Sequence, residues 1–216
     1  MAEKPTLPNS TLSEEQLKLV EQTTLSHYNN SATSFWNGTK DHDVSQNYAA
    51  LLAQFDESAS LHILDFGCGP GRDVSYFKSL GHKPIGLDGS FEFCEMARKH
   101  TGCEILCQSF LDLNLEEAKF DAIFANASLF HVPKQKLSQV LSALHCSLKP
   151  GGILFSSNPR GNSEGISNGR YGNFMEFEEA SACLSLAGFN VLNHYYRPEG
   201  LPIEQQPWLA IVSKRI

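Results

Sequence analysis

The chain has 216 residues, enough for one domain with a substantial core. Its formal net charge of −7 argues against the basic surface by which proteins attract nucleic acid, so we expect no nucleic-acid partner. No apolar run approaches the roughly 18 residues of a membrane span, and residues 1–18 are polar rather than a secretory signal. We therefore expect a cytoplasmic protein that makes no membrane contact.

The cysteines argue against disulfides and metal. There are six, mostly inside apolar segments, a pattern typical of free thiols in a reducing compartment. Cys103 and Cys107 lack the close pairing of a zinc site. We expect no bound metal.

The N-terminal part of the chain divides into a leader and a helical region. We predict that residues 1–12 form a flexible leader and that residues 13–216 form a single domain. Ser13 is a suitable cap for a helix that follows it. Residues 27–47 mix aromatic and polar side chains, which is unusual for a surface helix. They predict an N-terminal helical lid over a ligand site, with ordinary helix packing as the alternative.

From residue 61 onward, short apolar segments alternate with helical ones. This alternation predicts an α/β fold, a seven-stranded, mostly parallel sheet with helices on both faces. Ligands of such sheets bind beyond the carboxyl ends of the strands, and residues 158–173 form a long glycine-rich segment that we predict to be a functional loop. The predicted strands are residues 61–66, 84–88, 104–107, 120–125, 153–157, 189–196 and 207–212, and the predicted helices between them are 72–80, 91–100, 134–148 and 176–187.

A glycine turn follows the first predicted strand. In the sequence DFGCGPGRD, Gly67, Gly69 and Gly71 allow a tight turn and the close approach of a ligand to the backbone. Their G-x-G-x-G spacing differs from the G-x-G-x-x-G of dinucleotide sites. Asp65 stands two residues before Gly67, where a carboxylate favours a cationic ligand over a pyrophosphate.

An acid also ends the second predicted strand. Asp88 follows Gly71 by seventeen residues, at a position where a carboxylate can accept both hydroxyls of a ribose. A glycine turn, an acid before it and a ribose acid after it together resemble the S-adenosylmethionine site of class I methyltransferases. The resemblance implies a Rossmann-like fold with S-adenosylmethionine as cofactor and S-adenosylhomocysteine as its product. The alternative is a plain tight turn followed by a helix cap at Asp88.

The class I resemblance implies a role for each residue along the strand ends. Asp65 and the three glycines would hold the methionine part of the cofactor, and Asp88 with Gly89 and Ser90 would hold its ribose. Ser109 with Phe110 would hold the adenine, and Asn126 would lie near the methionine amino group or the methyl. Tyr28 and Trp36 would exclude water. Ser109 departs from the class, because many class I enzymes carry there an acid that accepts the adenine amino group. A hydroxyl accepts that bond more weakly than a carboxylate.

Longer passages resemble one family, the ovothiol-biosynthesis methyltransferases, often found as the C-terminal domain of 5-histidylcysteine sulfoxide synthase. The passages span about residues 27–210 and are HYNNSATSFWNGTKDHDVSQN, DFGCGPGRD, FANASLFHVP, KPGGILFSSNPRG, GRYG and HYYRPEGLPIEQQPWLA. The resemblance implies methylation of an imidazole nitrogen of 5-thiohistidine, giving ovothiol A. The chain lacks the iron-dependent sulfur-inserting portions of fused forms. It would act alone, or be an excised domain, on thiohistidine that a functional partner supplies.

An amino-acid substrate implies two charged contacts, an arginine for its carboxylate and an acid for its ammonium. For the first we consider Arg160, Arg170 and Arg197, and for the second Asp43. The residues expected to orient or assist the imidazole are His131, Asn47, Tyr171 and Asn126. Each of these side chains also has an ordinary structural explanation.

Three other functions remain open. A nicotinamide dehydrogenase shares the order strand, glycine turn, helix and acid, but the glycine spacing and Asp65 argue against it. A catalytically silent protein would bind S-adenosylmethionine without turnover. A methyltransferase could also act on another small nucleophile, such as a different imidazole or a thiol.

Overall fold

The structure is a computed structural model that describes residues 11–216. Of the predicted leader, residues 1–10 lie outside the described residues. Leu12 is held against the body of the chain, because its backbone N–H donates to Gln135 Oε1 at 2.7 Å and its carbonyl accepts from Gln135 Nε2 at 2.9 Å. Ser13 then caps the first helix through a capping box with Gln16, as its residue type predicts.

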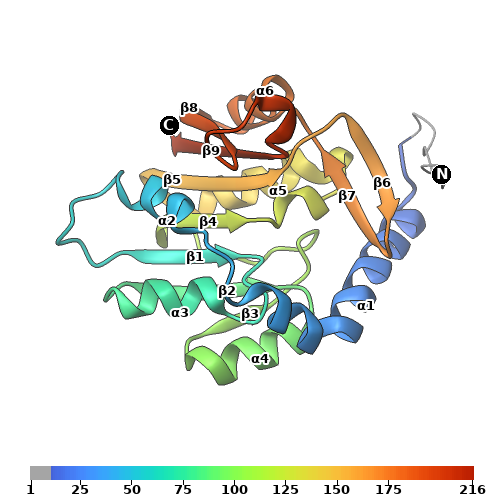
Figure 1. Ribbon diagram of the computed structural model, residues 1–216, viewed down its shortest axis with the longest axis horizontal. Coiled ribbons are helices and arrows are strands. Elements are labelled where there is room, and N and C mark those ends of the chain that lie inside the picture. The colour runs from blue at the N-terminus through green and yellow to red at the C-terminus, as the bar shows by residue number, and fades with distance from the viewer. Residues whose placement is uncertain (1–10) are drawn as a thin grey trace.

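A seven-stranded sheet forms the centre of the molecule (Figure 1). Its order is β3-β2-β1-β4-β5-β9-β8, in which the first five strands run parallel and β9 runs antiparallel to both β5 and β8. The seven-stranded, mostly parallel sheet predicted from the sequence is confirmed. Its strands are β1 (His62–Phe66), β2 (Lys83–Asp88), β3 (Ile105–Cys107), β4 (Phe120–Asn126), β5 (Leu148–Pro159), β8 (Phe189–Arg197) and β9 (Trp208–Arg215).

Helices cover both faces of the sheet because successive strand residues point to opposite faces. Ile63 of β1 packs on one face with Leu51 and Phe77, which come from α2 (Ser45–Leu52) and α3 (Arg72–Ser79). Leu64 packs on the other face with Leu141 of α5 (Lys134–Ser147) and with residues of α6 (Phe177–Leu186). Helix α4 (Phe91–Thr101) packs beside α3. Both sides of the central strands are therefore buried, as their continuous apolar sequence requires.

Two segments that differ from expectation lie at the end of the sheet to which the parallel strands point (Figure 1). Helix α1 (Glu14–Thr39) runs without a break, so the first part of the predicted lid 27–47 is the C-terminal part of this helix. The last residues of the predicted lid form the start of α2. The predicted loop 158–173 is wrong in part, because it contains most of a hairpin, β6 (Ser163–Ser167) and β7 (Arg170–Phe174). The hairpin packs against α1, and this contact favours paired strands over an open loop. No helix among residues 11–216 is long and apolar enough to cross a membrane.

Gly71 fixes the spacing between the glycine turn and α4. Its φ is +96°, and a Cβ there would lie 2.8 Å from Thr101 Cγ2 and 3.1 Å from Ala97 Cα. Gly81 has a similar φ of +86°, but nothing lies within 4 Å of its Cβ position. We expect G81A to lower the free energy of unfolding by about 1 kcal/mol through backbone strain alone. G71A should lower it by about 2–4 kcal/mol, because overpacking adds to the strain.

Urea unfolding of both variants measures this difference. Equal losses for G71A and G81A would show that the packing of Gly71 against α4 contributes nothing beyond its backbone conformation.

Candidate functional site

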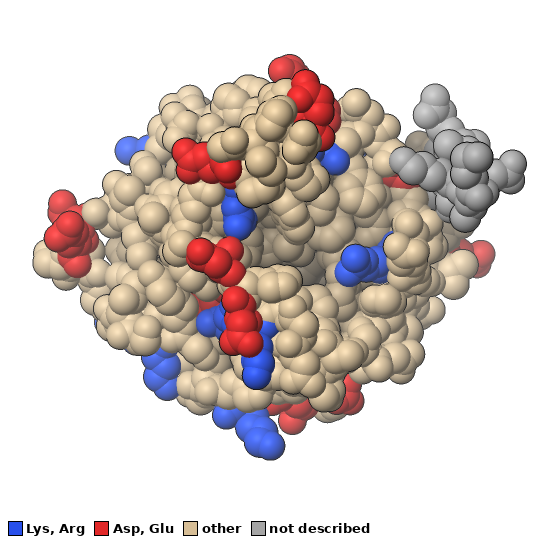
Figure 2. Space-filling model, viewed as in Figure 1, with Lys and Arg blue, Asp and Glu red and all other residues tan. Residues whose placement is uncertain are grey.

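A cavity of about 810 Å³ opens at the carboxyl ends of the parallel strands. Figure 2 shows a hollow near the centre of the face in view, with basic side chains on both sides of its mouth. The glycine turn and the end of β2 form one wall, α1 forms a second, and β4 with the β6–β7 hairpin contributes to a third. The arginines that line it are Arg72, Arg170 and Arg197.

The glycine turn is tied to the end of β2. The N–H groups of Gly67 and Cys68 both donate to the carbonyl of Leu87, at 2.7 and 3.0 Å, and Gly69 N–H donates to Asp88 Oδ2 at 2.9 Å. Gly67 has a φ of +80°, and a Cβ there would lie 2.3 Å from Ser128 Cβ. Gly69 instead borders the cavity, where the Phe35 ring at 3.7 Å is all that a Cβ would meet among the described residues. A ligand can therefore approach the backbone closely at Gly69.

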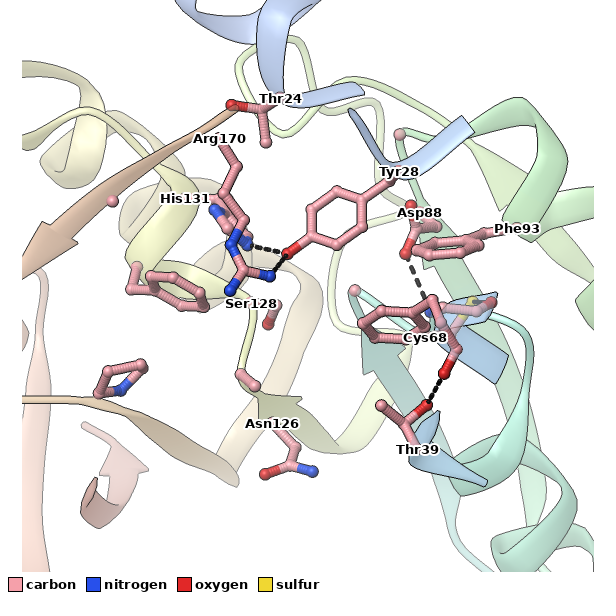
Figure 3. Close-up of a pocket in the computed structure, with 18 of the residues that line it drawn as sticks. Thr24, Tyr28, Thr39, Cys68, Asp88, Phe93, Asn126, Ser128, His131 and Arg170 are labelled. Carbon is pink, nitrogen blue, oxygen red and sulfur yellow. Dashed lines mark hydrogen bonds between the residues drawn. The ribbon is translucent and has the colours of Figure 1, made fainter. Parts of the chain in front are cut away.

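Asp88 lines the cavity at the end of β2 (Figure 3). Its oxygens accept from the N–H groups of Gly69 and Ser90, at 2.9 and 2.8 Å. A carboxylate has about four acceptor sites, so about two remain, enough for the two hydroxyls of a ribose. Burial raises the pKa of Asp88 to about 6, against the lowering effect of its backbone hydrogen bonds.

Asp65, expected at the methionine part, lies behind the cavity wall. It is 1% exposed and does not line the cavity, which corrects the expectation of direct contact. Burial, and then the neighbouring Asp73, raise its pKa well above the usual range, and no described residue bonds its Oδ2. Asp73 and Arg72 take the place at the wall instead. Arg72 donates to both oxygens of Asp73 and to the Thr39 carbonyl, which leaves guanidinium donors for a ligand carboxylate.

A half-buried tyrosine–histidine pair lies across the cavity from the glycine turn (Figure 3). His131 Nδ1 lies 2.6 Å from the carbonyl of Tyr171, which only accepts, so Nδ1 carries the proton. Burial lowers the pKa of His131 to about 4, so the ring is neutral at pH 7 and its Nε2 accepts from the Tyr28 hydroxyl at 2.7 Å. The Tyr28 oxygen in turn accepts from Arg170 Nη1 at 3.3 Å. This hydrogen-bond chain fixes the tautomer of His131 and the direction of Tyr28.

Two residues expected to bind the substrate do not reach it. Arg160 does not line the cavity, because its Nε pairs with Glu176 at 2.8 Å and its guanidinium lies over the Tyr196 ring. Asn47 is fully buried; its Nδ2 donates to Asn126 Oδ1 at 2.9 Å, so it holds Asn126 rather than a ligand.

Tyr171, expected in the catalytic set, contributes mainly its backbone. Its side chain is fully buried and its hydroxyl donates to Glu164, so the phenol is already engaged. Its carbonyl fixes His131, and its N–H donates to Thr24 Oγ1 at 2.9 Å. We correct its role to the positioning of His131.

Three further expected cofactor residues stand outside the cavity wall. Ser90 caps α4, Gly71 packs against α4, and Ser109 donates to a residue of α1. The expected residues that do line the cavity are Tyr28, Trp36, Asp43, Gly67, Gly69, Asp88, Gly89, Phe110, Asn126, His131, Arg170, Tyr171 and Arg197.

The rim of the cavity carries three of the expected residues. Asp43 is exposed, and its backbone carbonyl accepts from Arg197 Nη2 at 3.3 Å. The hydrogen bonds that Asp43 accepts from Ser45 lower the pKa of its side chain, which therefore stays charged. Trp36 stacks on His100 with ring centroids 4.6 Å apart. It thus lines the cavity from a position fixed by α4.

Sequence reasoning missed several residues that line the cavity. On α1 it missed Glu21, Thr24 and Phe35, and their helical spacing from the expected Tyr28 was the available signal. Ser128 was also missed; it is 2% exposed, lines the cavity and has an Oγ that bonds no described residue. Nothing in the sequence singles it out.

The sequence of this chain is similar to sequences of known methyltransferases. Residues 63–152 match the family described as "Methyltransferase domain". The chain is 30% identical over 105 residues to malonyl-[acyl-carrier protein] O-methyltransferase of Pseudescherichia vulneris, covering 48% of this chain and 41% of that one. It is 33% identical over 104 residues to ubiquinone biosynthesis O-methyltransferase of Nitrobacter winogradskyi, covering 46% and 39%. The matches thus span less than half of these curated relatives.

A solved structure matches almost the whole fold. The Burkholderia thailandensis 1,6-didemethyltoxoflavin-N1-methyltransferase, with bound 1,6-didemethyltoxoflavin and S-adenosylhomocysteine, has a TM-score of 0.79 at 20% identity, covering 97% of this chain and 93% of that one. A Leishmania major S-adenosylmethionine-dependent methyltransferase has a TM-score of 0.75 at 14% identity, covering 94% and 85%. These solved structures share the α/β Rossmann-like fold of this chain, and residues 63–152 are similar to a methyltransferase domain.

Proposed function

We propose that this chain transfers the methyl group of S-adenosylmethionine to an imidazole nitrogen of 5-thiohistidine, giving ovothiol A. One observation carries the proposal. Passages that resemble the ovothiol family but lie far apart in the sequence meet around one cavity: Tyr28, Gly69, His131 and Arg170 come from four of them. A cavity of about 810 Å³ is large enough for a cofactor and a small substrate together.

The residues around the glycine turn fit S-adenosylmethionine. Asp88 offers about two free acceptor positions for ribose hydroxyls, Gly69 allows close approach, and the remaining donors of Arg72 suit the methionine carboxylate. When bound, the cofactor supplies an electrophilic methyl group on a sulfonium. Aromatic side chains of α1 and α4, Tyr28, Phe35 and Phe93, pack together over this side of the cavity and would exclude water.

The opposite wall fits an amino acid with a heteroaromatic side chain. Arg170 has guanidinium donors beyond the one given to Tyr28, and they suit the substrate carboxylate. Asp43, charged at neutral pH and close to the rim, suits its ammonium. The edge of the ring would lie against Tyr28 and Asn126.

Orientation of the ring accounts for the chemistry without a strong base. An imidazole nitrogen already has a lone pair, so its methylation leaves a charge that the thiolate of the same ring balances. His131, neutral and hydrogen-bonded on both nitrogens, holds the Tyr28 hydroxyl still instead of taking a proton. Well-held geometry of this kind contributes up to about 7–11 kcal/mol to the lowering of a barrier.

The structural neighbour with bound ligands adds support of a different kind. Its name describes a methyltransferase that acts on the N1 position of 1,6-didemethyltoxoflavin. The same fold thus serves methylation of a heteroaromatic ring. A second candidate function follows from that neighbour, N-methylation of a heteroaromatic ring other than thiohistidine.

The raised pKa of Asp88 predicts how cofactor binding depends on pH. The carboxylate accepts the ribose hydroxyls, so a proton competes with the cofactor once the pH falls below about 6. We expect the dissociation constant of S-adenosylhomocysteine to be flat above pH 7 and to rise by up to about tenfold per pH unit below pH 6. Calorimetric titration between pH 5 and pH 8 measures this profile.

The stability of the cofactor-free chain should depend on pH in the opposite direction from cofactor binding. The folded chain holds the Asp88 proton more tightly than the unfolded chain, so this group's contribution to stability falls as the pH rises from about 4 to about 6. D88N serves as the control for both effects, because an amide does not titrate. A D88N profile as steep as that of the wild type would contradict the assignment.

A methyl-transfer assay tests the proposed function. The chain is incubated with S-adenosylmethionine and either 5-thiohistidine, histidine, cysteine or 1,6-didemethyltoxoflavin, and products are followed by mass spectrometry. We expect a methylated product from 5-thiohistidine at least a hundredfold faster than from the others. Cofactor binding without any product would favour a silent binding protein, and a product from the toxoflavin precursor alone would favour the second candidate.

A further inference from the structure

The end of β3 lacks the acid that would meet an adenine amino group, and α1 brings one to the same place. Ser109, the residue at that position, donates its hydroxyl to Oε1 of Glu21 and accepts from Leu111 N–H at 3.0 Å. Its donor is therefore spent within the protein, and its side chain does not line the cavity. Glu21, from a helix more than eighty residues earlier in the chain, does line it.

Apolar side chains line the cavity near Glu21. Phe110 and Leu111 after β3, Gly89 after β2 and Leu25 of α1 line the same part of the cavity. Phe110 is held in place by stacking on Phe66, with ring centroids 4.3 Å apart. Leu25 lies directly over Gly89, where its Cδ2 would be 2.8 Å from a Cβ. These contacts form apolar walls on either side of the segment that follows the ribose acid Asp88.

The acceptor capacity of Glu21 is only partly used. Among the described residues, Ser109 is the one hydrogen-bond partner of its carboxylate, and that bond reaches Oε1. Oε2 therefore remains available to a donor within the cavity. An adenine whose ribose is held by Asp88 carries such a donor, its exocyclic amino group, at the far end of the base.

We propose that Glu21 of α1 accepts the hydrogen bond of the adenine amino group and so selects adenine, with Ser109 as the positioning residue that directs its carboxylate. This inference rests on the proposed function, because it assigns the base end of the same cofactor site. It also gives α1 a second role, since the helix that covers the cavity would contribute a recognition group. Cofactor binding and the docking of α1 would then reinforce each other.

The test compares two ligands and three variants by isothermal titration calorimetry. The ligands are S-adenosylhomocysteine and its analogue with hydrogen in place of the adenine amino group. The variants are E21A, the conservative E21Q and the control E15A, whose carboxylate is exposed on the same helix and does not line the cavity. Thermal unfolding of each variant confirms that the chain is folded before titration.

A hydrogen bond to a carboxylate predicts that the wild type prefers S-adenosylhomocysteine by about ten- to a hundredfold. E21A should lose this preference by weakening S-adenosylhomocysteine alone, E21Q should keep part of it through its neutral oxygen, and E15A should match the wild type. Equal weakening of both ligands by E21A, or an unchanged preference, would overturn the inference.

The same titrations separate this inference from the proposed function. If the wild type prefers the ligand with the amino group but the methyl-transfer assay gives no product, the role of Glu21 stands and the proposed activity is removed. A wild-type chain that binds neither ligand would overturn both.

Discussion

D88A should weaken the binding of S-adenosylhomocysteine by about two to four orders of magnitude. Asp88 lies at the end of β2 with about two acceptor sites free, and each ribose hydroxyl that donates to a carboxylate contributes about 1.5–3 kcal/mol. The loss of both bonds thus costs about 3–6 kcal/mol. Isothermal titration calorimetry measures the change, and D88N, which keeps the shape and one acceptor, should fall between D88A and the wild type.

If Asp88 had a structural role instead, D88A would change the melting temperature. Its bonds to the N–H groups of Gly69 and Ser90 also shape the turn, so the melting temperature of D88A is measured alongside. D112A provides a matched control, because Asp112 is an exposed acid close to the end of the neighbouring strand β3 and does not line the cavity. Unchanged affinity in D88A would remove Asp88 from the ribose site.

R170A should lower kcat/KM for 5-thiohistidine by about 30- to 200-fold, mostly through KM. Arg170 lies on β7, lines the cavity and donates to the Tyr28 hydroxyl at 3.3 Å, which directs its guanidinium inward. Removal of one partner of an arginine–carboxylate pair costs about 2–3 kcal/mol at a partly buried site. Initial-rate kinetics with saturating cofactor measure this loss.

Two comparisons make the Arg170 experiment specific. R160A is the matched control, because the sequence offers Arg160 and Arg170 as candidates for the same role. Arg160 pairs with Glu176 outside the cavity, so the kcat/KM of R160A should stay within about twofold of the wild-type value. The second comparison uses the decarboxylated substrate, 5-thiohistamine. The wild type should use it poorly and R170A should not discriminate against it. Discrimination that survives in R170A would place the carboxylate elsewhere.

Much of the fold was predictable because its signals are local. Alternating apolar segments and helices predicted the seven-stranded sheet, and the glycine turn with Asp88 predicted one wall of the cavity. The β6–β7 hairpin was not predictable, since Ser163–Phe174 contains three glycines and no run of strand-forming residues. Its pairing depends on α1, which lies more than a hundred residues away in the chain.

The opposite wall was harder to predict, because its residues are selected by tertiary contacts. Arg160 and Arg170 differ only in what lies beside them, Glu176 in one case and Tyr28 in the other. Tyr171 was chosen for its phenol, yet it is its carbonyl that fixes His131. Helical spacing puts Glu21 on the same side of α1 as Tyr28, but its role follows from the hydrogen bond with Ser109, a residue that the sequence marked as a departure.

The central claim is that the cavity presents a ring nitrogen of thiohistidine, instead of its thiolate, to the methyl group. The most direct test uses S-adenosylmethionine with a carbon-13 methyl group and locates the transferred carbon in the product by two-dimensional NMR. The account predicts a correlation from the labelled methyl to ring carbons on either side of a nitrogen. A methyl on sulfur or on the α-amine, with the ring nitrogens unchanged, would contradict it.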